Sequence, residues 1–280
     1  MLATDLLREN FVNSIWIAVS LACFLWWFLT GVILYIVNWA DNKGLSYHRF
    51  VTVGLLPVLI VGFYGFLYTL KESSILSVYL SFISALSIWG WLELAFLTGV
   101  ITGPDRVMRP TEVNGFKRFW LAWRAVAYSE IMLTLVFFIL FILSLGEENL
   151  FGFFTFLILY FARLSAKLNL FFGVPKINVE FLPARVVHLA SHFKVSGISW
   201  FFPISVISLI GLVIYWFSYF RISMNIESVS GTIGYSLLLT LTVLAVLEHF
   251  FMIITFRDAV LWRWMIPKSQ STKDSDLKRR

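Results

Sequence analysis

Seven apolar stretches, each long enough to cross a lipid bilayer, constrain what this chain can fold into. A spanning helix needs about 20 predominantly apolar residues. The stretches lie at Ser14–Val37, Val51–Leu70, Ile75–Ile101, Trp123–Leu145, Leu150–Val174, Ile198–Phe220 and Thr232–Thr255. Only 14% of the 280 residues are charged, against about a quarter in soluble domains. The sequence therefore predicts an all-α, polytopic membrane bundle of about seven transmembrane helices.

The apolar stretches are predicted to form one domain. No linker rich in Ser, Gly or Pro divides them, so residues 1–267 are expected to be a single transmembrane helical domain. Residues 268–280, KSQSTKDSDLKRR, are polar and basic and are predicted to be a disordered cytoplasmic tail beside anionic lipid headgroups. The segments KESS (Lys71–Ser74) and GEEN (Gly146–Asn149) are predicted to be tight turns.

The distribution of basic residues predicts the orientation in the membrane. With seven spans, one side carries seventeen Lys and Arg residues and the other side carries three. Cytoplasmic loops carry the excess of positive charge, so the N-terminus is predicted to lie outside and the C-terminus in the cytoplasm. The net charge of +6 is therefore assigned to contacts with membrane lipids and not with nucleic acid.

A set of polar residues lies inside the apolar stretches. These residues are Glu93, Glu130, Arg163, Lys167, Glu248 and His249. A cation near the bilayer centre costs about 2.5–3.5 kcal/mol, so each cation is expected to have a partner. Counted from the helix ends, the three carboxylates and Lys167 lie about 10–12 Å below the cytoplasmic surface. We therefore expect Arg163 and Lys167 to face the bundle interior and to pair with the three carboxylates, with His249 adjusting the charge balance.

Two interpretations of this intramembrane cluster remain open. Polar groups in lipid can act as a buried ion-pair network that only fixes the helix register. They can also form a pocket for an amphiphile or a cofactor that opens toward the cytoplasmic leaflet. Carboxylates with a histidine can hold a metal, but Glu248 and His249 are adjacent and lack the Glu-x-x-His spacing of carboxylate-bridged bundles. No metal site is predicted.

The segment PARVVHLASHF, which begins at Pro183, predicts an amphipathic helix on the cytoplasmic interface. Arg185, His188 and His192 recur at i, i+3 and i+7 and share its polar face. The two histidines are four residues apart, a spacing that can bind a metal. A polar face toward the interface is the simpler interpretation.

Several runs resemble one known family. The run RLSAKLNLFFGVPKINVEFLP (Arg163–Pro183), followed by HLASHF, resembles the signature of the PuhE family of photosynthetic complex assembly proteins. FLTGVITGP (Phe96–Pro104) is similar to a second block of that family. The resemblance implies a multi-span protein of the inner membrane of an anoxygenic phototrophic bacterium. It also identifies family-pattern positions, which are Arg163, Ser165, Lys167, Asn169, Glu180 and Pro183.

Three positions depart from the family pattern. Leu92, Ser129 and Leu164 stand where the family often has histidine. A histidine set for metal or bacteriochlorophyll is therefore absent at these positions, which argues against metal-dependent catalysis.

Two classes of function follow. The first is a membrane assembly factor that promotes maturation of the photosynthetic reaction centre and the core light-harvesting complex. Its partners would be reaction-centre or core-antenna subunits, and its polar pocket would hold bacteriochlorophyll or a lipid. The second is a membrane enzyme or transporter that acts on a tetrapyrrole, an isoprenoid or a quinone. The sequence contains no nucleotide-binding loop or Asp-rich prenyltransferase motif, which favours the first class, and no catalytic residue is assigned.

Overall fold

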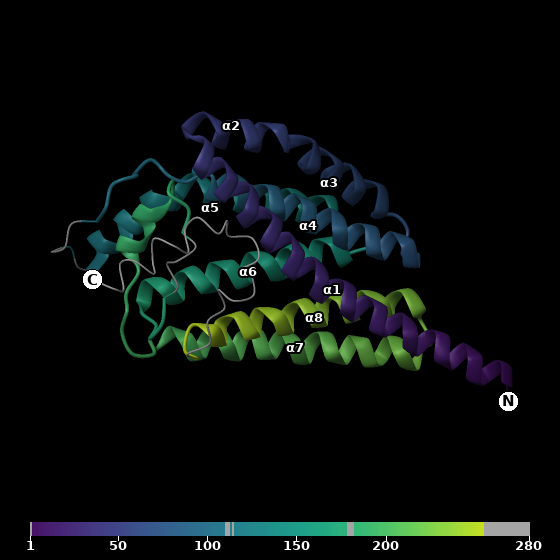
Figure 1. Cartoon of the computed structure of the whole chain (residues 1–280). Coiled ribbons are helices and arrows are strands. Elements are labelled where there is room, and N and C mark those ends of the chain that lie inside the picture. The colour runs from purple at the N-terminus through teal and green to yellow at the C-terminus, as the bar shows by residue number, and fades with distance from the viewer. Residues whose placement is uncertain (1, 110–112, 114, 178–181, 255–280) are drawn as a thin grey trace, which may run out of the picture.

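The computed structural model describes residues 2–109, 113, 115–177 and 182–254, and their regular structure is entirely helical. Figure 1 shows the arrangement of the helices. The elements are α1 (Leu2–Lys43), α2 (Leu45–Gly54), α3 (Leu56–Thr69), α4 (Ile75–Leu97), α5 (Gly115–Leu143), α6 (Phe151–Phe172), the 3₁₀ helix η1 (Val187–His192), α7 (Phe201–Asn225) and α8 (Val229–Phe251). The predicted basic tail, residues 268–280, lies outside the described residues.

The prediction of an all-α fold with seven spanning segments is confirmed. Seven helical stretches among the described residues are long and apolar enough to cross a membrane. The second of them is divided, because α2 ends at Gly54 and α3 begins at Leu56 with a proline in its first turn, where the missing N–H costs nothing. α1 runs further than predicted, to Lys43, and a single residue separates it from α2. That residue is Gly44, whose φ of 114° favours glycine.

α6 lies in the middle of the bundle. It packs against α4, α5, α7 and α8. α1 crosses these helices obliquely in Figure 1 and packs against α4 and α8. α3 pairs with α4, and α7 pairs with α8. Polar groups on α6 can therefore reach four neighbouring helices.

Apolar side chains fill the spaces on both sides of α4 and α6. One core cluster includes Phe82, Trp216 and Leu237 and joins α1, α4, α6, α7 and α8. A second includes Phe66 and Phe156 and joins α3, α4, α5 and α6. Close packing of such rings resists sliding of one helix along another. The two clusters therefore hold the polar residues of α4 and α6 at fixed heights.

Asn149 joins the two predicted tight turns at one end of the bundle. Its backbone N–H donates to the Leu70 carbonyl at 2.9 Å, and its side-chain oxygen accepts from the N–H of Phe151 at 3.2 Å. The residue is 1% exposed. Its contacts fix the start of α6 against the end of α3, and thereby set the register of the helix that carries both intramembrane cations.

Candidate functional site

Four charged side chains from three helices meet in the interior. Glu93 comes from α4, Glu130 from α5, and Arg163 and Lys167 from α6. Arg163 Nε lies 2.8 Å from a Glu93 oxygen, and its Nη1 lies 3.1 Å from Glu130 Oε1. Lys167 Nζ lies 2.5 Å from the same Glu130 oxygen. We call these four residues the charge cluster, in which two carboxylates balance two cations.

Aromatic rings flank the two cations. Phe96 is close to both of them, with its ring centroid 4.7 Å from the Arg163 guanidinium carbon and 4.1 Å from Lys167 Nζ. Trp89 lies 5.8 Å from the same guanidinium carbon. Cations are attracted to ring faces, and more so where water is excluded. The side chain of Arg163 is 8% exposed, so its charge is neutralised by protein groups.

A close approach of two backbones positions Glu130. The Thr102 carbonyl, in the segment after α4, accepts a hydrogen bond at 2.8 Å from the N–H of Ser129. Gly103 lies directly against the backbone of Arg124 and Ala125, where a side chain would overlap α5. The FLTGVITGP run therefore docks α4 onto α5 one residue before Glu130.

Glu248 and His249 make other contacts, so part of the predicted pairing is wrong. Glu248 accepts a hydrogen bond at 2.8 Å from the indole N–H of Trp26 on α1. His249 Nε2 lies 2.5 Å from the Ser165 hydroxyl, and its Nδ1 lies 2.8 Å from the Ala245 carbonyl. Adjacent residues on a helix point about 100° apart. His249 therefore faces α6 while Glu248 turns toward α1, and no described cation pairs with Glu248.

The RLSAKLN run (Arg163–Asn169) connects α6 to four helices. Arg163 reaches α4 and α5, and Lys167 reaches α5. Ser165 contacts α8 through His249. The buried Asn169 donates to Ser205 on α7 at 2.9 Å. Of the remaining family-pattern positions, Pro183 lies buried in the segment before η1, and Glu180 lies outside the described residues.

Two cavities lie on opposite sides of the charge cluster. The first, called here the α1 cavity, measures about 300 Å³ between α1, α4, α6 and α8, and its wall includes Glu93, Arg163 and Glu248. The second, called here the η1 cavity, measures about 350 Å³ between α5, α6 and η1, and its wall includes Glu130 and Lys167. Volumes of this size are typical of small-molecule pockets. The charge cluster thus presents a different polar surface to each cavity.

The segment after Pro183 differs in extent and in contacts from the amphipathic helix that was predicted. It forms only the six-residue η1, after a turn in which the Val186 N–H donates to the Pro183 carbonyl. Leu189 and Val186 pack against Phe96 and Ala125, so the segment is bound to protein. His188 and His192 are each 6% exposed and do not form an interfacial polar face with Arg185.

The environment of η1 keeps both histidines neutral. Burial, with Arg109 nearby, lowers the pKa of His192 to about 4. Burial, with Arg106 nearby, also lowers the pKa of His188. A charged imidazole would be poorly solvated there and would face arginines. η1 therefore presents an uncharged surface at neutral pH.

Lowering the pH from 7 to 5 is expected to destabilise the protein through His192. Its pKa is about 4 in the folded state and about 6.5 in an unfolded chain. The unfolded state then binds the extra proton, so stability rises with pH between about 4 and 6.5 and is independent of His192 above that range. The measurement is the Tm of the purified protein at pH 7 and pH 5, beside His192→Asn. A variant that loses as much stability as the wild type would contradict the assignment.

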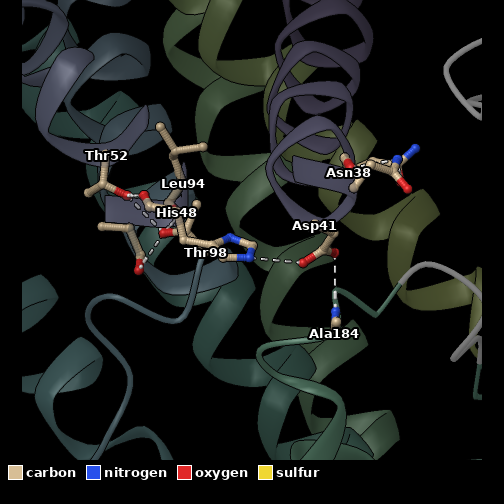
Figure 2. A network of polar contacts seen from close by, with 9 residues as sticks. Asn38, Asp41, His48, Thr52, Leu94, Thr98 and Ala184 are labelled. Atoms are coloured by element: carbon tan, nitrogen blue, oxygen red, sulfur yellow. Dashed lines mark hydrogen bonds and ion pairs between the residues drawn. The ribbon is translucent and has the colours of Figure 1, made fainter. Parts of the chain in front are cut away.

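A second polar network was missed from the sequence. Figure 2 shows Asp41, at the end of α1, between His48 and Ala184. One carboxylate oxygen lies 3.2 Å from His48 Nε2, and the other accepts from the N–H of Ala184 at 3.2 Å. Thr52 and Thr98 share a hydrogen bond of 2.9 Å between α2 and the end of α4. The sign of this network in the sequence is an acid and a histidine, Asp41 and His48, which lie seven residues apart on either side of Gly44. The network fastens the segment before η1 to α1.

No metal site is found in the part of the chain that the structure describes. No three or more His, Cys, Asp or Glu side chains gather there as a metal ion would require. The four members of the charge cluster pair with one another.

Comparisons with known proteins agree over nearly the whole chain. A family model described as "Protein of unknown function (DUF3623)" matches residues 12–273. A protein of Rhodobacter capsulatus described as "Uncharacterized 30.4 kDa protein in puhA 5'region" is 39% identical over 264 residues, covering 94% of this chain and 95% of the relative. No solved structure matches the chain.

Proposed function

The chain belongs to the DUF3623 family, and from this premise we propose that it is a membrane assembly factor of bacterial photosynthesis. In this proposal it promotes maturation of the reaction centre and the core light-harvesting complex. It does so by holding pigment or lipid beside the charge cluster, and its partners are subunits of those complexes.

The observation that carries the proposal is the gene neighbourhood of the relative. Its description places it in the puhA 5' region, which points to a photosynthesis-related role. The resemblance of the Arg163–Pro183 run to photosynthetic complex assembly proteins supports the same process. The seven apolar helices make the chain a multi-pass membrane protein. We place it in the inner membrane with its N-terminus outside, because that orientation puts most basic residues in the cytoplasm.

The geometry supports holding an amphiphile. The four members of the charge cluster balance one another, and the adjoining cavities have largely apolar walls. Such a pocket can orient a polar head group by hydrogen bonds while burying an apolar tail. This arrangement agrees with delivery or retention of a pigment or lipid during assembly.

Deleting the gene in a phototrophic host is expected to lower the levels of reaction centre and core antenna while pigment synthesis continues. An assembly factor acts after its pigments are made, so their total extractable amount should change less than the membrane-bound complexes. The measurement is the absorption spectrum of isolated membranes beside a pigment extract of the same cells. Wild-type gene supplied in trans should restore the spectrum, and so should Gly211→Ala, whose site is open in the structure.

Two other outcomes would decide against the proposal. Unchanged spectra and unchanged photosynthetic growth would show that assembly does not need the protein. Loss of all pigment together with the complexes would favour an enzyme or transporter that acts on a tetrapyrrole, an isoprenoid or a quinone.

A further inference from the structure

The η1 cavity is a mainly apolar chamber with three polar residues in its wall. Its polar lining residues are Glu130, Lys167 and His192, and the rest of its wall is apolar or aromatic. Two of the aromatic residues, Phe119 and Trp123, are 41% and 36% exposed. They lie at the outer edge of the cavity, so an apolar chain held there can continue outward along α5.

Lys167 is the charged hydrogen-bond donor in this wall. An ammonium group has three N–H bonds, and within the described part of the chain Lys167 donates one hydrogen bond, to Glu130. Its side chain remains 24% exposed although it lies deep in the bundle. The exposed part of the side chain lines the η1 cavity, where an acceptor atom on a ligand can reach the ammonium group.

The charge balance selects an uncharged head group. Glu93 and Glu130 already neutralise Arg163 and Lys167. An anionic head would bring a net negative charge beside Glu130, and a cationic head would face Lys167. Either would bury an uncompensated charge in a medium of low dielectric constant. A carbonyl oxygen adds no charge and accepts a hydrogen bond.

We propose that the η1 cavity binds an uncharged amphiphile with a carbonyl group, such as an ester or a ketone, next to Lys167. The apolar tail runs past Phe119 and Trp123 toward the lipid. This inference deepens the proposed function. It rests on the proposed function in one respect, which is that both place an amphiphile beside the charge cluster.

The α1 cavity is a poorer site for the same ligand. Its wall contains Glu248, which no described cation neutralises, and Glu93. Two of the donors there, Trp26 and Arg163, already serve Glu248 and the charge cluster, and the described residues of this wall include no ammonium group with unused N–H bonds. The two cavities therefore provide a comparison within one molecule.

The test uses three probes with the same twelve-carbon chain and different head groups. Methyl dodecanoate is uncharged, dodecanoate is anionic and dodecyltrimethylammonium is cationic. Each is added to the purified full chain in nanodiscs, and the Tm is measured. A ligand that binds only the folded state raises the Tm. At a hundred times its Kd, methyl dodecanoate is expected to raise the Tm by about 5–10 °C, and the charged probes are expected to raise it less.

Two matched variants locate the binding site. Ala122→Phe fills the η1 cavity, and Ala166→Phe makes the same change in the wall of the α1 cavity. The shift caused by the ester should disappear in Ala122→Phe and persist in Ala166→Phe. Three results would overturn the inference. The first is a shift that persists in Ala122→Phe and disappears in Ala166→Phe. The others are a larger shift with dodecanoate than with the ester, and no shift with any probe.

A second measurement on the unaltered chain covers the case in which Ala122→Phe does not fold. The same ester with a diazirine near the end of its chain is photo-crosslinked, and the labelled peptides are identified by mass spectrometry. Labelling is expected on α5 and α6 beside the η1 cavity. Labelling confined to α1 and α8 would overturn the inference. If the ester binds as expected and gene deletion leaves the complexes unchanged, the proposed function fails while this inference stands. If gene deletion lowers the complexes and the ester does not bind, this inference fails while the proposed function stands.

Discussion

Replacing Arg163 with methionine is expected to remove about 3–5 kcal/mol of folding free energy, as in other buried ion pairs that lose one partner. Arg163 lies within 3.1 Å of carboxylate oxygens on Glu93 and Glu130. Without it, two carboxylates are left with Lys167 alone. The measurements are the amount of protein in isolated membranes and the Tm after purification. Both should fall well below the wild-type values.

Lys167→Met provides a graded comparison. Lys167 pairs with Glu130 alone, and its side chain is 24% exposed against 8% for Arg163. A charge that is less buried and has fewer partners contributes less. The loss of stability should therefore be smaller than in Arg163→Met. Equal stability of both variants and the wild type would show that the cations are satisfied by lipid or water.

Second substitutions identify the partners of Arg163. Arg163→Met combined with Glu93→Gln removes one cation and one carboxylate, so part of the lost abundance should return. Arg163→Met combined with Glu248→Gln is the matched control, because Glu248 is bound to Trp26 and not to Arg163. Rescue by Glu248→Gln and not by Glu93→Gln would contradict the contacts of the charge cluster.

The same double variant separates the two interpretations of the cluster. If the charges only hold the helices together, the rescued protein should restore both its own abundance and the photosynthetic complexes in a deletion strain. If they hold a ligand, the abundance should return while the complexes remain low.

Gly103→Ala is the second change with a large expected effect. A Cβ at this position would overlap the backbone of α5 at Arg124 and Ala125, and backbone cannot move aside as a flexible side chain can. Overpacking of this kind costs about 1–3 kcal/mol or more. The hydrogen bond from Ser129 to Thr102 would lengthen as well, so Glu130 would move away from Arg163. The measurement is the Tm of the purified variant.

Gly211→Ala is the matched control for Gly103→Ala. Gly211 lies within α7, and nothing lies within 4 Å of the position that its Cβ would take. Alanine is the better helix former by about 1 kcal/mol, so the Tm of this variant should equal or exceed that of the wild type. A Tm of Gly103→Ala equal to that of Gly211→Ala would mean that α4 and α5 do not approach as closely as described.

The sequence predicts the seven spans because length and hydrophobicity are local properties. It also places Glu93, Glu130 and Lys167 at similar depths, because depth depends only on the distance from a helix end. It predicts that the two cations face the interior, but it does not predict which neighbouring helix each polar residue contacts. Glu248 has a similar expected depth, but the packing of α8 turns it toward Trp26. Rotation of a helix about its axis depends on all its neighbours, and no single stretch of sequence contains that information.

The segment around η1 shows a second limit. Polar residues at helical spacing from Pro183 onward predict a surface helix, but periodicity does not distinguish a lipid surface from a protein surface. The structure buries both histidines of η1. The contact of Asp41 with His48 and Ala184 was equally hidden, because Asp41 and Ala184 lie 143 residues apart.

The contacts of the RLSAKLN run restrict the spacing of its residues along α6 more strictly than they restrict the residue types. Arg163, Ser165 and Asn169 each face a different neighbouring helix. One residue inserted between Arg163 and Asn169 would turn the second half of the helix by about 100° relative to the first. No rotation of the whole helix could then restore every contact at once. We therefore expect exchanges of residue type along this run to be tolerated where the exchanged groups still pair, and a residue gained or lost within it to break contacts unless a local π-bulge absorbs it.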